Sequence, residues 1–113
     1  KENKNDEDIV FHIKNYIQEH YQDNNLNVAE IGRKFGKTPY YISKLFKDSQ
    51  GTAMLEYINH IRVEKAKELL NSTKDTLDVI SEKVGFTNVV TFMRVFKKHT
   101  GITPGKFRGI GAI

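Results

Sequence analysis

Cysteine is absent from this chain of 113 residues. Without thiols the chain forms no disulfide, builds no thiolate zinc site and offers no cysteine nucleophile. A composition free of cysteine suits a reducing compartment. We therefore expect a cytoplasmic protein, with a membrane-tethered full-length form as the alternative.

Long apolar runs are also missing. No stretch is long enough to cross a bilayer, and no charged-then-apolar leader opens the chain. The first residue is Lys1 instead of an initiator Met, so we expect a piece of a longer protein.

The motifs of common enzyme classes are missing as well. The sequence shows no Ser/His/Asp set, no paired carboxylates, no phosphate-binding P-loop and no HExxH zinc motif. The four histidines lack the spacing of metal ligands: His12, His20, His60 and His99. We predict that the chain is not an enzyme and that it uses neither a metal nor another cofactor.

The formal net charge is +4, and eleven of the eighteen Lys and Arg residues fall into two groups. The first group is Arg33, Lys34, Lys37, Lys44 and Lys47, and the second is Lys83, Arg94, Lys97, Lys98, Lys106 and Arg108. Acidic residues gather elsewhere, in residues 2–8 and near Asp75 and Asp78. Clustered basic residues are typical of phosphate binding. Charge alone, however, fits the solvated surface of a helical protein better.

Apolar residues recur at helical spacing along the whole chain, which predicts an all-α fold of about seven helices. The first helix has Asp6 as its cap, after frayed residues 1–5, and an inner face of Ile9, Ile13, Tyr16 and Ile17. We divide the rest of this single domain into a first helix-turn-helix at about 26–51, a linker helix at about 52–71, and a second helix-turn-helix at about 76–101. A C-terminal turn at 102–108 and a disordered tail at 109–113 complete the prediction.

The two helix-turn-helix segments are copies of one plan. Asn27 and Thr76 cap the first helix of each copy, Gly36 and Gly85 mark the turns, and Gly51 and Gly101 end the second helices. The second helices begin at caps Thr38 and Asn88, and their predicted inner residues correspond: Ile42, Leu45 and Phe46 with Phe92, Val95 and Phe96. One such pattern is weak, because helical corners are common, but two copies joined by a long helix are far more specific.

In a helix-turn-helix, the first helix braces the second, whose outer face fits the major groove of DNA. A linker of about 20 residues spans roughly 30 Å at about 1.5 Å per residue. Successive major-groove faces on one side of B-DNA lie about 34 Å apart. The spacing therefore predicts two second helices in adjacent grooves.

The residues quoted above resemble the DNA-binding domain of AraC/XylS-type bacterial transcription regulators over about 26–108. The signature reads Ile80 through Gly85 and Phe86, then Phe92, Phe96, Lys97, Gly101, Pro104, Phe107 and Arg108, with Tyr57, Ile58, Arg62, Ala66, Leu69 and Leu70 on the linker helix. The resemblance implies two helix-turn-helix subdomains and an upstream sensor or receiver domain. It also implies that residues early in the two second helices face DNA bases.

These considerations give fourteen candidate DNA-binding residues: Thr38, Pro39, Tyr40, Tyr41, Ser43, Lys44, Lys47, Asn88, Val89, Val90, Thr91, Arg94, Lys97 and Lys98. Val89 and Val90 suit contact with thymine methyl groups. Lys47 and Lys97 suit either a phosphate or the C-terminal end of a helix dipole.

Other residues have a structural interpretation. Five phenylalanines are expected in the core: Phe35, Phe46, Phe86, Phe92 and Phe96. Arg62 and Arg108 are expected to pair with carboxylates or with carbonyls at helix ends.

The predicted function is sequence-specific binding of double-stranded DNA by the output domain of a bacterial transcription regulator, with RNA polymerase as a further partner. The alternative is a helical interaction module that presents its basic face to an acidic protein. A steep loss of affinity with salt and a preferred duplex would separate the two.

Overall fold

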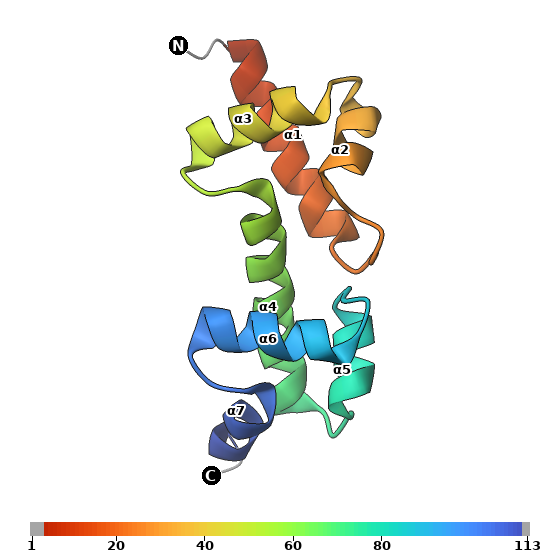
Figure 1. Cartoon of the computed structure of the whole chain (residues 1–113), viewed down its shortest axis with the longest axis vertical. Coiled ribbons are helices and arrows are strands. Elements are labelled where there is room, and N and C mark those ends of the chain that lie inside the picture. Colours follow the sequence, from red (N-terminus) through yellow and green to blue (C-terminus); the bar gives the residue numbers. More distant parts are fainter. Residues whose placement is uncertain (1–3, 112–113) are drawn as a thin grey trace. The chain divides into compact units, whose positions relative to one another are not determined.

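A computed structural model describes residues 4–111 of the chain (Figure 1). The described residues form seven helices and no strand, which confirms the predicted all-α class. They are α1 (Lys4–His20), α2 (Val28–Phe35), α3 (Pro39–Gln50), α4 (Met54–Ser72), α5 (Leu77–Lys83), α6 (Val89–Thr100) and α7 (Pro104–Gly111). The chain divides into two compact units: unit 1 comprises the residues up to His20 with Asn25–Ile58, and unit 2 comprises Tyr21–Asn24 with the residues from Asn59 onwards.

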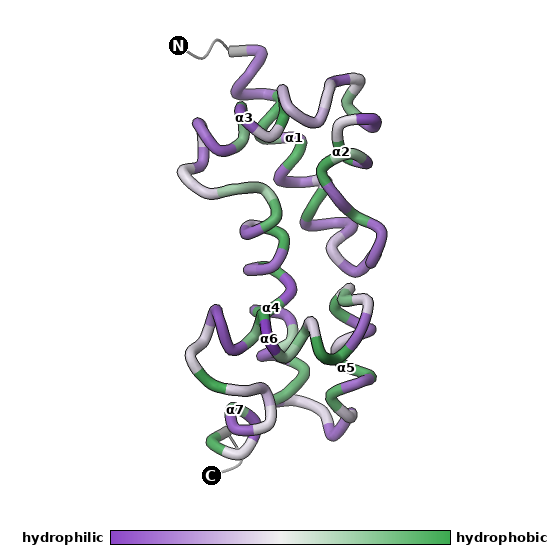
Figure 2. The backbone as a smooth tube through the Cα atoms, viewed as in Figure 1, coloured by the Kyte–Doolittle hydropathy of each residue, from purple (hydrophilic) through white to green (hydrophobic). Residues whose placement is uncertain are grey.

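Unit 1 contains α1, α2, α3 and the first residues of α4. Its core consists of apolar residues from all four helices, among them Ile13, Ile17, Ile31, Ile42, Phe46 and Met54. Hydrophobic and hydrophilic residues alternate along the helices in Figure 2, as expected for helices that bury one face. Phe35 is only half-buried, and its ring meets that of Tyr16 edge-on at 6.1 Å between centroids.

Unit 2 packs the rest of α4 against α5 and α6. Its core consists of Val63, Ala66, Leu70, Ile80, Val84, Phe86, Phe92, Val95 and Phe96. Phe107 of α7 packs on this core, with 5.6 Å between its ring centroid and that of Phe96. Four of the five phenylalanines expected in the core are therefore buried.

The predicted helix caps are present in both units. Asn27 and Asn88 each accept a hydrogen bond at 2.8 Å from the backbone N–H three residues later. Thr38 and Thr76 do the same at 3.1 and 3.2 Å. These bonds satisfy N–H groups that the first turn of a helix leaves unpaired. The helix starts that orient α3 and α6 are thus fixed by local sequence.

Three predicted boundaries are wrong. Helix α1 already begins at Lys4, so Asp6 lies inside its first turn instead of capping it. Helix α4 begins at Met54 and not at Thr52, because Thr52 and Ala53 complete the turn that Gly51 opens with φ of 76°.

The C-terminal tail was also predicted incorrectly. Helix α7 continues to Gly111, and residues 109–111 are therefore helical; residues 112–113 lie outside the described part. Thr103 accepts a hydrogen bond from the Lys106 N–H at 3.2 Å, and Phe107 anchors the helix on the core. These two contacts lie before residues 109–113 in the chain and hold α7 in place, although residues 109–113 have no polar side chain of their own.

The inner face of α1 is rotated from the prediction. Val10, not Ile9, is buried with Ile13 and Ile17. In α4, Met54 and Ile58 lie four residues apart on the buried face, and Leu55 is 56% exposed.

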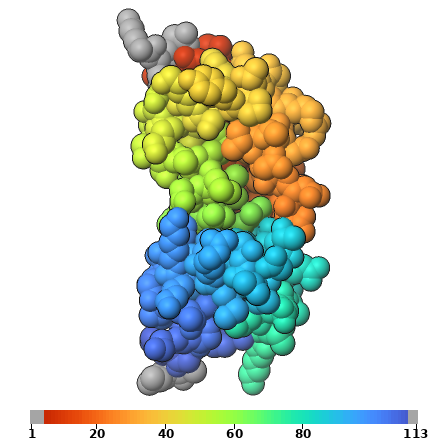
Figure 3. All heavy atoms as spheres, viewed as in Figure 1, coloured from red at the N-terminus to blue at the C-terminus, as the bar shows by residue number. Residues whose placement is uncertain are grey.

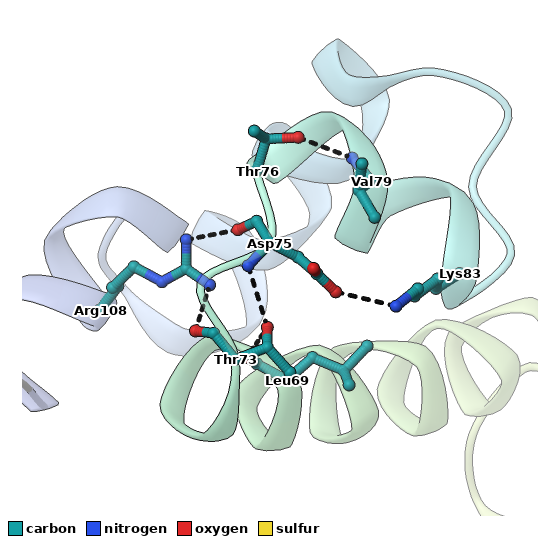
Figure 4. Close-up of polar contacts among 7 residues, drawn as sticks. All are labelled: Leu69, Thr73, Asp75, Thr76, Val79, Lys83 and Arg108. Atoms are coloured by element: carbon teal, nitrogen blue, oxygen red, sulfur yellow. Dashed lines mark hydrogen bonds and ion pairs between the residues drawn. The ribbon is translucent and has the colours of Figure 1, made fainter.

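Arg108 joins α7 to the end of α4 (Figure 4). Its guanidinium donates to the carbonyl oxygens of Leu70, Thr73 and Asp75 at 3.2, 3.1 and 2.6 Å. The Asp75 carboxylate in turn pairs with Lys83 at 2.8 Å. Arg108 thus binds carbonyls at a helix end, one of the two roles expected for it.

Arg62 has the same kind of role at another place in unit 2. Only 6% of Arg62 is exposed, and its guanidinium donates to the carbonyl oxygens of Tyr21 at 2.8 Å and Asp23 at 3.0 Å. Burial lowers the pKa of Arg62, and the charge of Asp23 partly opposes this shift. The Phe86 ring covers the guanidinium at 5.6 Å. Arg62 therefore holds the Tyr21–Asn24 segment on unit 2.

Candidate nucleic-acid interface

The outer face of α3 is the candidate interface of unit 1. Thr38 and Pro39 start the helix, and both are exposed. Tyr40, Lys44 and Lys47 are exposed at a spacing of four and three residues, which puts them on one side of the helix. Ser43, on the same side, is half-buried.

Tyr40 and Tyr41 have different surroundings. Tyr40 is 76% exposed and projects from the start of α3. The Tyr41 hydroxyl donates to Asp6 Oδ1 of α1 at 2.8 Å, and the Lys37 ammonium lies 5.3 Å from the centre of the Tyr41 ring. The hydrogen bond to Asp6, with smaller contributions from burial and the Asp6 charge, raises the pKa of Tyr41. Of the two tyrosines, Tyr40 is the one whose side chain is available to a ligand.

Lys44 shares its face of α3 with an acidic residue. Its ammonium lies 3.1 Å from the Asp48 carboxylate, one turn later, and both side chains are exposed. A shallow groove beside this pair is lined by Thr38, Tyr40, Tyr41, Lys44, Leu45 and Asp48. The face of α3 is therefore aromatic and polar, with part of its positive charge neutralised.

The outer face of α6 is the candidate interface of unit 2, and its atoms lie uncovered on the side of unit 2 drawn in Figure 3 (blue). Arg94, Lys97 and Lys98 are exposed, and the twelve residues of α6 include no Asp or Glu. Within residues 4–111, Arg94 and Lys97 form no ion pair with a carboxylate. Lys97 and Lys98 lie in the last turn of the helix, where its dipole favours positive charge. Unlike Lys44 of α3, Arg94 and Lys97 of α6 therefore present positive charge that no ion pair among these residues neutralises.

The apolar residues of α6 correct the sequence interpretation. Val89 is half-buried and packs on the core of unit 2, so it is not the exposed residue that we expected. Val90 is 71% exposed, and Met93 is 38% exposed. Thr91, half-buried, donates its backbone N–H to the cap Asn88.

Met93 was not among the candidate residues, although the internal repeat places it at a position equivalent to one of them. The second helices begin fifty residues apart, at Pro39 and Val89. Met93 therefore corresponds to Ser43, which was among the candidates. Counting from the two caps would have identified it.

Two features are absent from the part of the chain that the structure describes. No group of three or more His, Cys, Asp or Glu residues is arranged to hold a metal ion. Among the helices described, none is long and apolar enough to span a membrane.

Comparisons with known proteins place the chain in a family. A family model described as a helix-turn-helix domain matches residues 31–110. The arabinose operon regulatory protein of Escherichia coli is 34% identical over 93 residues, which are 82% of this chain and 32% of that protein. The probable transcription factor PqrA of Proteus vulgaris is 34% identical over 109 residues, 95% of this chain and 88% of its own length.

A solved structure agrees with both relatives. The C-terminal domain of AraT, a response regulator from Geobacillus stearothermophilus, superposes with a TM-score of 0.88 at 32% identity, covering 90% of this chain and 84% of that one. The chain spans about a third of the length of the arabinose operon regulator. From its matched residues and its fold, the chain belongs to the AraC/XylS-type helix-turn-helix family of transcription regulators, which is not an enzyme class.

Proposed function

We propose that this chain is the output domain of a bacterial transcription regulator and binds double-stranded DNA sequence-specifically, with α3 and α6 entering adjacent major grooves. The observation that carries the proposal is the matched exposure of the two helices. Tyr40 and Val90, fifty residues apart, are 76% and 71% exposed. Phe46 and Phe96, also fifty residues apart, are fully buried. Each unit thus turns the same face of its second helix to solvent.

Charge supports the same function. Lys44 and Lys47 of α3 correspond to Arg94 and Lys97 of α6, and all four are exposed. Arg and Lys on the outer face of a helix suit contact with phosphates and with guanine in the major groove. Thr38 and Asn88 cap the two helix starts, where backbone N–H groups also suit phosphate contact, and Pro39, which has no N–H, sets the direction of the first turn of α3.

The family gives the biological setting of the proposal. One relative is named a probable transcription factor and another an operon regulatory protein. Because the chain spans about a third of the latter, we propose that a sensor or receiver domain accompanies it in the full-length protein. RNA polymerase as a further partner and a cytoplasmic location belong to the same proposal.

The test is selection of bound duplexes from a random pool, followed by titration of the selected duplex at several salt concentrations. We expect one preferred sequence and a linear fall of log affinity with log salt, at a slope of about −0.9 for each phosphate contacted. An acidic peptide titrated in parallel tests the alternative of a protein-interaction module. Binding of the peptide together with equal, weak binding of every duplex would contradict the proposal.

A further inference from the structure

The exposed face of α6 has an apolar part. Val90 and Met93 lie three positions apart on the helix, so their side chains are neighbours, with about 5–6 Å between Cβ atoms. They are 71% and 38% exposed, while Phe92 between them is fully buried. Arg94 and Lys97 continue the same face along the helix. The result is a small apolar surface directly beside two cations.

Neither side chain belongs to the core of unit 2 or to the residues that pack against it. The core receives its apolar residues from the opposite face of α6, through Phe92, Val95 and Phe96. The corresponding positions of α3 hold Tyr40 and Ser43, which shows that the same fold accepts polar groups there. A ligand with an apolar group next to negative charge would complement the α6 surface.

The major groove of DNA presents such a combination. The C5-methyl group of thymine is the apolar group on a base edge, and phosphates line both sides of the groove. A separation of about 5–6 Å between side chains matches one to two base steps at about 3.4 Å each. Cytosine, adenine and guanine offer no methyl group at this edge.

We infer that Val90 and Met93 read the methyl groups of thymines in the half-site of unit 2, while Arg94 and Lys97 contact guanine or phosphate beside them. This inference rests on the proposed function and adds to it a specificity-determining pair. It replaces Val89, whose side chain packs on the core, by Met93. The two half-sites then differ in chemistry: unit 1 reads through the aromatic and polar face of α3, and unit 2 reads A·T pairs through α6.

The test replaces each thymine of the selected duplex in turn by uracil, which removes only the methyl group and keeps base pairing. At thymines read by Val90 or Met93, we expect wild-type affinity to fall about fourfold, the effect of losing one buried methyl group. For the variants Val90→Ser and Met93→Gln, affinity for the thymine duplex should fall, and the additional effect of uracil should disappear at the corresponding position. Val79→Ser, at a valine of α5 that is 39% exposed, is the matched control and should retain the full uracil effect.

The outcomes separate the inference from the proposed function. A preferred duplex whose affinity is unchanged by uracil at every position would overturn the reading of methyl groups and leave DNA binding intact. A uracil effect that persists in both variants would assign the methyl contact to other residues and also overturn the inference. Absence of any preferred duplex would instead overturn the proposed function. The uracil series uses the unmodified protein, so it remains decisive if a variant fails to fold.

Discussion

At the scale of single residues, Arg94 and Lys97 are expected to act differently on DNA, although both are exposed cations on α6. The planar guanidinium of Arg94 can bond a guanine in two places, whereas the ammonium of Lys97 acts as a point charge. Arg94→Ala should cost about 1–3 kcal/mol of binding and relax preference at one base pair. Lys97→Ala should weaken binding to all duplexes alike and reduce the salt slope by about one.

Titrations of matched and mutated duplexes at several salt concentrations measure both effects. Lys74→Ala, an exposed lysine outside both second helices, is the control for general loss of charge. If Arg94→Ala weakens every duplex equally, Arg94 is a phosphate contact and base reading by α6 rests on other residues.

A second prediction concerns Tyr41 and Asp6. The hydrogen bond from the Tyr41 hydroxyl to Asp6 stabilises the neutral phenol, and this is the largest cause of its raised pKa. Asp6→Asn removes the carboxylate charge and weakens the acceptor, so the pKa of Tyr41 should fall and the phenolate should form at lower pH. NMR titration of ring-labelled tyrosine, with the signal assigned by Tyr41→Phe, measures this shift. An unchanged pKa in Asp6→Asn would mean that the hydrogen bond does not persist in solution.

At the scale of helices and turns, the sequence predicted correctly the helix starts and ends that a single residue determines. The caps Asn27, Thr38, Thr76 and Asn88 were predicted correctly, because each cap bond joins residues only three apart. The left-handed glycines at helix ends follow from the same local logic.

What the sequence could not determine is the rotation of each helix against its neighbours. Val89 and Val90 look equivalent in sequence, yet only Val89 packs on the core. The hydrogen bond between Tyr41 and Asp6 joins residues 35 positions apart, and no local sequence pattern predicts it. The exposure of the candidate residues could therefore not be read from the sequence alone, and the exposed Met93 was not among them.

The turns of the two helix-turn-helix units give a third prediction, because their glycines differ in surroundings. Gly36 and Gly85 both have positive φ, 67° and 107°. A Cβ at Gly36 would meet open space, whereas a Cβ at Gly85 would lie 2.2 Å from the Tyr21 carbonyl oxygen and 2.8 Å from Arg62 Nε. Gly36→Ala should therefore cost only the left-handed conformation, about 1–2 kcal/mol of folding free energy.

Gly85→Ala should cost at least about 2 kcal/mol more, since the methyl group displaces the Tyr21–Asn24 segment and disturbs the hydrogen bonds of Arg62. Urea denaturation followed by circular dichroism gives the total loss, and amide hydrogen exchange shows which unit loses stability. Equal losses for the two variants would show that unit 2 accommodates a methyl group at this turn.

At the scale of the whole molecule, α4 is the element shared by the two units (Figure 1). Its nineteen residues span about 28 Å at about 1.5 Å per residue. We expect this helix to set the spacing between the two half-sites. Two glycines inserted between Ile58 and Asn59, at the boundary of the units, would break the helix there and leave the core residues Val63 and Ala66 in unit 2 undisturbed. Affinity for a duplex with both half-sites should then fall by about 10²-fold or more, because binding of one unit no longer holds the other unit at its half-site.

The matched control is Asn59→Gly combined with His60→Gly, which introduces the same two glycines without lengthening the chain. Titrations of duplexes with one half-site should give wild-type affinity for the insertion variant, since neither α3 nor α6 is altered. Footprinting should show protection of one half-site at a time. If the insertion lowers affinity for the duplex with both half-sites more than the control does, the length of α4 and the rotation between its two ends are the cause. If both variants lose the same affinity, the stiffness of α4 alone is the cause. Wild-type affinity and a complete footprint for the insertion variant would mean that the units find their half-sites independently of α4.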